Sequence, residues 1–385
     1  MKCKICGVEN CDKHGFFLGK TKPIQEFSGS SPPEIFVGSW NYPNIYTGIL
    51  SPNEYGDTYK FSSPEFWHSK KLSIQEVLSL RNQLIYGRTQ THIKKTSSKF
   101  LSVMQEVAQT SKSIAAEFKL KKPIAHQKEQ SPNSPLIAKA ADVSEVKLQE
   151  NPKIEKKVDY LVNDTEVKSK DALLELEKAK IPTSSIIKLL SAGLLGLEAN
   201  RKLVPTRWSI TAVDDTLSKE KIKAIKFFPE IQEILVFNAE YVGNHYEFIL
   251  LPSSWSFEVI EISLKNFGVW HDYELSFPRK YYANSVTGAY YSNRLAVTEY
   301  LSKIKKQASV VVMREVRQEY AYPLGVGILR ETSREAFSKG PKKFSTLKEA
   351  FADIQTRLKL PISNFVTNSI ILNNFNKQKK LSEFF

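Results

Sequence analysis

The stretch that decides how this chain is organised is residues 190–215, LSAGLLGLEANRKLVPTRWSITAVDD. It begins as the end of an amphipathic helix with glycines placed to terminate it. Pro205 cannot sit inside a helix, so we predict that a short strand follows, from Trp208 to Val213. That strand ends on Asp214 and Asp215. Arginine, tryptophan and paired carboxylates therefore crowd around one strand end, which is unusual in a solvated linker.

The composition around this stretch describes a globular, basic protein. The chain has 385 residues, of which 41% are hydrophobic and 11% aromatic, enough for two or three domains with a sizeable core. The formal net charge of +14 favours a polyanionic partner, most commonly nucleic acid, although a basic surface kept for solubility gives the same number. No apolar run approaches the roughly 18 residues of a membrane span, and the N-terminus lacks a signal-peptide core. We therefore expect no membrane partner and a cytoplasmic location.

The N-terminus carries a compact metal-binding pattern. Cys3, Cys6, Cys11 and His14 form CxxC-x4-CxxH, a three-thiolate, one-imidazole set suited to tetrahedral zinc. The surrounding sequence has too little apolar content to fold without a metal, and no ligand position stays open. We predict a structural zinc site. A disordered leader with incidental cysteines is the alternative.

The remaining elements predict an α+β fold with a mixed sheet and flanking helices in the C-terminal half, beside the small N-terminal zinc-binding element. Strands are expected at 35–37, 45–50, 255–264, 309–317 and within 322–331. Two more are expected within 233–252, around a hairpin turn at Gly243-Asn244. Helices are expected at 70–86, 97–117, 289–306, 345–357 and 361–372. The aromatics of 29–64 could stack bases, although aromatics in such density more often form a core.

These patterns divide the chain into five parts. They are a zinc-binding element (1–20), an N-terminal region (21–120), a flexible linker or insertion (121–157), an α+β domain (158–372) and a mobile tail (373–385). The linker is expected because Pro, Ser, Gln and Lys dominate its sequence and apolar periodicity disappears.

A set of charged residues beside apolar segments is the best candidate for a pocket. Its members are Arg81, Arg207, Asp214, Asp215, Arg294, Arg314 and Glu315. Carboxylates at strand ends could hold Mg²⁺ and arginines could clamp phosphates, as a metal-dependent enzyme acting on DNA or a nucleotide requires. Each arginine could instead pair with a structural carboxylate, and no catalytic residue is assigned.

The tail ends in Q-x-x-L-x-x-F-F, formed by Gln378, Leu381, Phe384 and Phe385. This is the pattern of a peptide that binds the sliding clamp PCNA. One 3₁₀ turn places Leu381 and Phe384 on the same side, and Phe385 extends that apolar plug. We predict that the tail docks into the clamp, which would bring the protein to the nucleoid.

Several motifs resemble the archaeal Nre family of DNA repair proteins. They are the block 190–215, Phe36-Val37-Gly38, Tyr42-Pro43, Gly56-Asp57-Thr58, Pro64-Glu65, Trp67, Tyr290-Tyr291, Arg294-Leu295-Ala296, Arg314-Glu315 and Tyr322-Pro323-Leu324-Gly325. The resemblance covers nearly the whole chain outside the segment 121–157, and implies a DNA damage-response role with recruitment by the clamp. It supplies no settled reaction. Three hypotheses remain: a clamp-recruited repair protein with a DNA-contacting body, the enzyme described above, and a non-catalytic scaffold of a repair complex.

Overall fold

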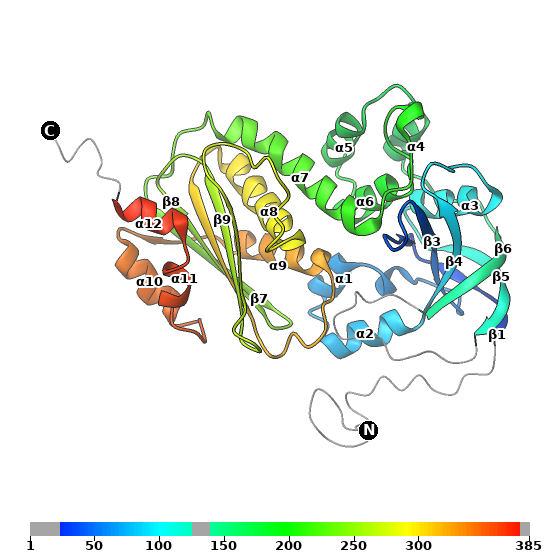
Figure 1. Ribbon diagram of the computed structural model, residues 1–385, viewed down its shortest axis with the longest axis horizontal. Helices are drawn as coiled ribbons and strands as arrows, with labels where there is room; N and C mark the ends of the chain where they lie inside the picture. Colours follow the sequence, from blue (N-terminus) through cyan, green and yellow to red (C-terminus); the bar gives the residue numbers. More distant parts are fainter. Residues whose placement is uncertain (1–23, 125–138, 378–385) are drawn as a thin grey trace, which may run out of the picture. The chain divides into compact units, whose positions relative to one another are not determined.

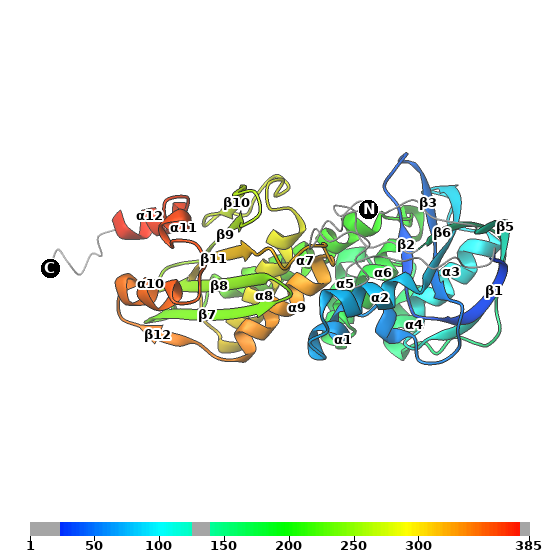
Figure 2. The same cartoon turned by 90° about the horizontal axis from the view of Figure 1, so that it is seen from below.

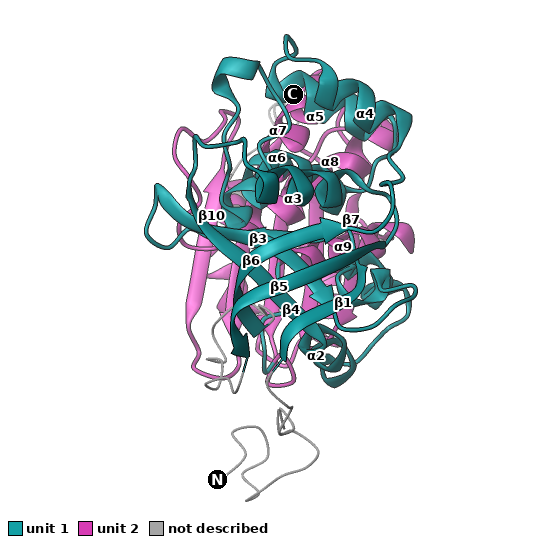
Figure 3. Cartoon of the chain, turned by 90° about the vertical axis from the view of Figure 1, so that its right-hand side faces the viewer, with its two compact units in different colours: residues 1–213, 321–325 teal, residues 214–320, 326–385 magenta. Residues whose placement is uncertain are grey.

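The computed structural model describes residues 24–124 and 139–377 (Figure 1). The proposed zinc ligands Cys3, Cys6, Cys11 and His14 lie outside these described residues, and so do the tail residues Gln378, Leu381, Phe384 and Phe385. The chain divides into two compact units, coloured in Figure 3. Unit 1 is residues 1–213 and 321–325, and unit 2 is residues 214–320 and 326–385.

Unit 1 is built on a six-stranded sheet in the order β1-β5-β6-β4-β3-β2. Its strands are β1 (Ile24–Ser31), β2 (Ile35–Val37), β3 (Asn44–Pro52), β4 (Leu84–His92), β5 (Ile114–Ile124) and β6 (Lys139–Leu148). Neighbours are antiparallel except β4 and β6, which run parallel. The strands predicted at 35–37 and 45–50 are confirmed as β2 and β3.

Helices of unit 1 are short. They are α1 (Pro64–Ser69), α2 (Ile74–Asn82), α3 (Lys99–Gln109), α4 (Lys156–Asn163), α5 (Ser169–Lys178), α6 (Thr183–Ser191) and the first residues of α7 (Thr206–Ile225). Short 3₁₀ turns lie at Tyr59–Phe61 and Glu198–Asn200. Helix α2 begins with a capping box in which Ser73 and Glu76 satisfy each other's backbone N–H groups.

Two helices predicted in unit 1 are shorter than expected, because a strand follows each of them. The helix predicted over 70–86 ends at Asn82, and β4 begins at Leu84. The helix predicted over 97–117 ends at Gln109, and β5 begins at Ile114. In β5 every second side chain from Ile114 to Leu120 is buried, which is the period of a strand and not of a helix.

The segment 121–157, interpreted from its composition as a linker or insertion, contributes to the sheet. Strand β6 lies within it and pairs with both β5 and β4. Its buried side chains Ala141, Val143 and Val146 are separated by polar ones, so the strand carries an alternating pattern in a polar composition. Residues 125–138 of the segment lie outside the described part of the chain.

Unit 2 is built on a second six-stranded sheet, in the order β10-β9-β11-β8-β7-β12. Its strands are β7 (Ile234–Tyr241), β8 (Asn244–Leu251), β9 (Ser256–Ser263), β10 (Val269–Glu274), β11 (Ser309–Val316) and β12 (Lys342–Phe344). β9 and β11 are parallel, while the other pairs are antiparallel. The predicted β7–β8 hairpin is confirmed, with Gly243 in the left-handed region at φ 77°.

Helices cover both faces of this sheet. They are α8 (Gly288–Ile304), α9 (Val326–Ser338), α10 (Leu347–Gln355), α11 (Ser363–Val366) and α12 (Ile370–Lys377), together with α7. One core packs the sheet against α7, α8 and α9, and a second packs its other face against α10, α11 and α12 (Figures 1 and 2). Every residue of β8 and β9 is consequently buried. The predicted α+β class with a mixed sheet and flanking helices is confirmed.

The strand predicted from Trp208 to Val213 is wrong: these residues belong to helix α7. Pro205 lies just before the first turn, where its missing N–H costs nothing and its fixed φ favours a helix start. The buried positions Ser209, Val213 and Leu217 recur every four residues. Because the first of them is a serine, the pattern of apolar residues does not predict a helix here. Asp214 and Asp215 therefore lie inside a helix and not at a strand end.

Two further differences lie toward the C-terminus. The strand predicted within 322–331 is the start of α9, which follows Gly325 at φ 96°. Residues 373–377, assigned to the mobile tail, form the end of α12, where Phe375 packs against the second core of unit 2. The described residues contain no helix that is long and apolar enough to cross a membrane.

Candidate nucleic-acid interface

The predicted charged set is divided between the two units, and Arg81 and Arg207 lie in unit 1. Arg81 is at the end of α2, with Nη1 3.8 Å from Glu34 Oε1 and 3.5 Å from the carbonyl oxygen of Phe61. Glu34 also pairs with the buried Lys188, at 2.9 Å. This is an internal ion-pair cluster. Arg207 is exposed, in the first turn of α7.

Asp214 is fully buried in unit 2, and it pairs with Arg330 of α9. The Arg330 guanidinium donates two hydrogen bonds to the two carboxylate oxygens, at 2.9 and 2.7 Å. Burial raises the pKa of the Asp214 carboxyl above its usual range, and the Arg330 charge opposes that shift. The pair joins α7 to α9 through a bidentate contact.

Asp215 and Arg294 are the two members of the set that the structure brings together. Arg294, on α8, is 1% exposed and donates to Asp215 and, at 2.8 Å, to Glu274 of β10. Its Nε donates to Ser218 Oγ at 3.1 Å. Each of the three guanidinium nitrogens thus donates to a protein group, and the cluster ties α7, α8 and β10 together.

Arg314 and Glu315 are consecutive on β11 and point to opposite faces of the sheet. Arg314 donates to Glu261 at 2.7 Å and to Asn244. Glu315 accepts from Arg317 and from the backbone N–H groups of the segment after α10, at 2.8 and 2.9 Å. The two residues serve different ion-pair networks.

These networks bear on the enzyme hypothesis. The four arginines Arg81, Arg294, Arg314 and Arg330 each have a carboxylate partner from the chain itself. Within residues 24–124 and 139–377, no group of three or more His, Cys, Asp or Glu side chains is arranged to hold a metal ion. Apart from the exposed Arg207, the geometry of the set is that of closed internal pairs.

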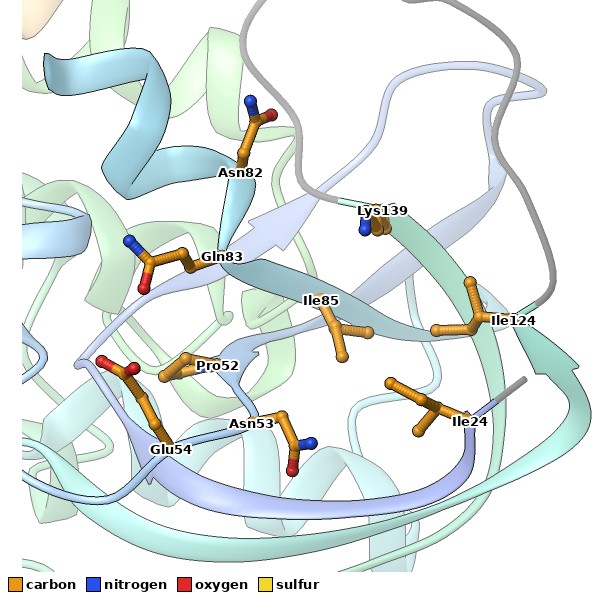
Figure 4. A pocket seen from close by; sticks show the side chains of 9 residues that line it. All are labelled: Ile24, Pro52, Asn53, Glu54, Asn82, Gln83, Ile85, Ile124 and Lys139. Carbon is orange, nitrogen blue, oxygen red and sulfur yellow. The ribbon is translucent and has the colours of Figure 1, made fainter. Parts of the chain in front are cut away.

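A cavity of about 270 Å³ lies beside the ends of β1, β4 and β5 in unit 1 (Figure 4). Ile24, Ile85 and Ile124 form its apolar wall, and Glu54 and Lys139 bring opposite charges to it. Three of these residues, Ile24, Ile124 and Lys139, border chain segments outside the described residues.

One exposed surface of unit 1 includes Trp40 and Tyr42, two of the aromatics of 29–64 for which the sequence leaves base stacking and a core as alternatives. Trp40 is 86% exposed, Tyr42 45% and Trp208 44%, although large aromatic side chains are normally covered. The rings of Tyr42 and Trp208 lie 5.1 Å apart between centroids. The turn before β3 and the first turn of α7 thus present aromatic side chains together.

Basic residues accompany these aromatics. The exposed members are Lys94 and Lys95, in the turn after β4, and Lys202 and Arg207, around the start of α7. We call these four residues, with Trp40, Tyr42 and Trp208, the aromatic–basic surface. Its parts are brought together by backbone pairing: Ile93 N–H donates to Pro43 O at 3.1 Å, and Leu203 N–H donates to Ile93 O at 2.9 Å.

The sequence alone does not connect Trp208 or the lysines with the aromatics of 29–64. Tyr42 and Trp208 lie far apart in the sequence, with most of the residues of unit 1 between them. The sequence pattern also assigns Trp208 to the face of a predicted strand. The signal that was available is Arg207-Trp208 after Pro205, a basic–aromatic pair at a helix start, where side chains of the first turn often face solvent.

Comparison with known proteins finds matches along nearly the whole chain. The family description "Archaeal Nre, N-terminal" matches residues 5–271, and "Archaeal Nre, C-terminal" matches residues 274–384. The chain is 34% identical to DNA repair protein NreB of Archaeoglobus fulgidus, covering 99% of this chain and 97% of that protein. It is 34% identical to DNA repair protein NreA of the same organism, covering 100% and 98%.

A third relative is DNA repair protein NreA of Haloferax volcanii, which is 32% identical and covers 87% of this chain and 84% of its own length. No solved structure matches the chain significantly. The two family descriptions together span nearly all of the sequence, including both units. The chain therefore belongs to the archaeal Nre family, as its motifs predicted.

Proposed function

We propose that this chain is a DNA repair protein that the sliding clamp PCNA recruits through its C-terminal peptide, and whose basic body contacts DNA. The observation that carries the repair role is the similarity to three proteins named as DNA repair proteins, over 84–98% of their lengths. A match of that extent includes both units and leaves no large additional domain to account for the role of the relatives.

The recruitment rests on the chemistry of the tail. Gln378, Leu381, Phe384 and Phe385 stand at the spacing of a PCNA-interacting peptide. Burying each apolar side chain in a clamp groove contributes about 1.5–3 kcal/mol before the cost of ordering the peptide. Lys379 and Lys380 would add attraction to an acidic rim, which makes the encounter sensitive to salt.

The DNA contact rests on charge and its placement. The formal net charge is +14, and the aromatic–basic surface gathers four of the exposed cations in unit 1. Neutralising phosphates releases condensed counterions, so a basic body gains affinity for DNA from charge alone. A structural zinc at Cys3, Cys6, Cys11 and His14 would complete the N-terminal element.

Titration of purified PCNA with the full-length chain tests the recruitment. Replacing Phe384 and Phe385 with alanine removes two buried rings and should weaken clamp binding about 100-fold or more. Ser382→Ala is the matched control, because Ser382 lies in the same peptide at a position that the motif leaves free. Equal affinities for the wild type and the double variant would show that the tail is not the contact.

A further inference from the structure

We propose that the aromatic–basic surface of unit 1 binds single-stranded DNA, with unpaired bases stacked on Trp40, Tyr42 and Trp208. The inference rests on the proposed function and deepens it, because it names the form of the nucleic acid and the side chains that hold it. Its starting point is that all three side chains are exposed, that Trp40 and Tyr42 belong to one turn, and that the rings of Tyr42 and Trp208 lie 5.1 Å apart between centroids.

The rings are held on a rigid support. The turn from Trp40 to Pro43 passes through Asn41 at φ 60°, a left-handed conformation that asparagine tolerates. Hydrogen bonds fix its far end, since Pro43 O accepts from Ile93 N–H and Ile93 O accepts from Leu203 N–H. Ile93 and Leu203 themselves are buried.

The helix that carries Trp208 is fixed to the same support. Thr206 Oγ1 accepts the backbone N–H of Val37 at 2.9 Å and lies 3.1 Å from Ser191 Oγ. Ser191 O in turn accepts the N–H of Val204 at 3.0 Å. Strand β2, helix α6 and the start of α7 are thus joined just below the exposed rings. A preformed support lowers the ordering cost of binding.

The charges select the class of partner. Lys94 and Lys202 flank the hydrogen-bonded residues Ile93 and Leu203, and Arg207 directly precedes Trp208. Cations interleaved with exposed aromatic rings provide both contacts that a single strand requires, one for its phosphates and one for the faces of its bases. A purely apolar protein partner would use the rings and leave these cations without a role.

The rings also select the single strand over the duplex. In a duplex the faces of the bases are already stacked on one another, so an exposed indole finds no free base face there. Unpaired bases expose both faces, and each base–aromatic stack contributes enough to change the affinity measurably. The duplex would still be bound through the cations.

Fluorescence anisotropy with a labelled oligothymidylate of about 16 nucleotides, an upper site size for such surfaces, measures the effect. In the full-length protein, Trp40→Ala and Trp208→Ala should each weaken binding about 5-fold to 150-fold. Trp40→Phe, which keeps an aromatic face, should retain most of the affinity. Lys94→Gln should reduce the slope of log K against log salt by about 0.7, while the tryptophan variants leave the slope unchanged.

A matched control is Tyr160→Ala on α4. Tyr160 is 60% exposed and has Lys157 Nζ 4.9 Å from its ring centroid, so it repeats the aromatic–basic pairing elsewhere in unit 1. Its replacement should change affinity by less than about twofold. The tryptophan variants should melt at the same temperature as the wild type, which would show that the fold is intact, since Trp40 is largely exposed.

Tryptophan variants that lose no more affinity for the oligonucleotide than Tyr160→Ala does would overturn the inference. A wild-type protein that binds duplex but not the single strand would also overturn it, and the proposed function would stand. A wild-type protein that binds neither form of DNA contradicts the DNA contact in the proposed function as well. The clamp titration is independent of both results.

Discussion

At the scale of single residues, the buried arginines of unit 2 form ion pairs inside the unit and stabilise its fold. Arg294 and Arg330 are almost fully buried and each meets carboxylates of the same unit. An arginine inside an apolar segment predicts an anionic partner, and that much could be read from the sequence. The identity of the partner could not, because Asp214 and Arg330 are 116 positions apart.

Breaking one such pair gives a residue-scale prediction. Arg330→Met leaves the Asp214 carboxylate buried without its partner and should lower the free energy of unfolding by about 3–5 kcal/mol in urea denaturation. Replacing Asp214 with leucine in the same variant removes the orphaned charge and should recover much of the loss. Arg207→Met is the control, since an exposed arginine should change the free energy by no more than about 0.5 kcal/mol. Equal stability of Arg330→Met and the control would refute the structural role of the pair.

At the scale of elements, the sequence predicted the helices and strands whose apolar residues form a run or repeat without a polar interruption. The hairpin β7–β8 and the strand β11 are apolar runs bounded by turn residues or charges, and both are present. Helix α7 was missed because polar side chains occupy several of its buried positions, at Ser209, Asp214 and Ser218. Strand β6 was missed because its exposed half is so polar that composition concealed the alternation.

Strand β6 can be tested as part of the sheet. Val143 is buried between β4 and β5, so Val143→Asp would place an unpaired charge in the core of unit 1 and should unfold it or lower its melting temperature strongly. Ser144→Asp puts the same charge on the exposed neighbour and should be close to neutral. A flexible linker would tolerate both substitutions alike, and equal melting curves would support that interpretation.

The zinc-binding element gives a second prediction at this scale. We expect one zinc ion per chain in elemental analysis, and Cys3→Ser or Cys6→Ser should lower that stoichiometry. Because the two described units have their own sheets and cores, loss of the metal should leave their melting temperatures unchanged. Purified protein without stoichiometric metal would contradict the predicted zinc site.

At the scale of the whole molecule, the chain combines two structural units that carry different features. Unit 1 presents the aromatic–basic surface, and the described part of unit 2 ends in α12, which directly precedes the proposed clamp-binding peptide in the sequence. One boundary between the units, between Val213 and Asp214, falls inside α7. The similarity to Nre proteins extends through both units, so evolution has kept them in one chain.

Survival after DNA damage, measured in an archaeal strain that lacks its own Nre protein, is the most direct test of a repair role that depends on recruitment by the clamp. The wild-type chain should restore survival, and so should Ser382→Ala. The double variant Phe384→Ala/Phe385→Ala should fail to do so at equal protein levels, because its body is intact but the clamp cannot recruit it. Survival with the double variant equal to that with the wild type would contradict a repair role that depends on recruitment by the clamp.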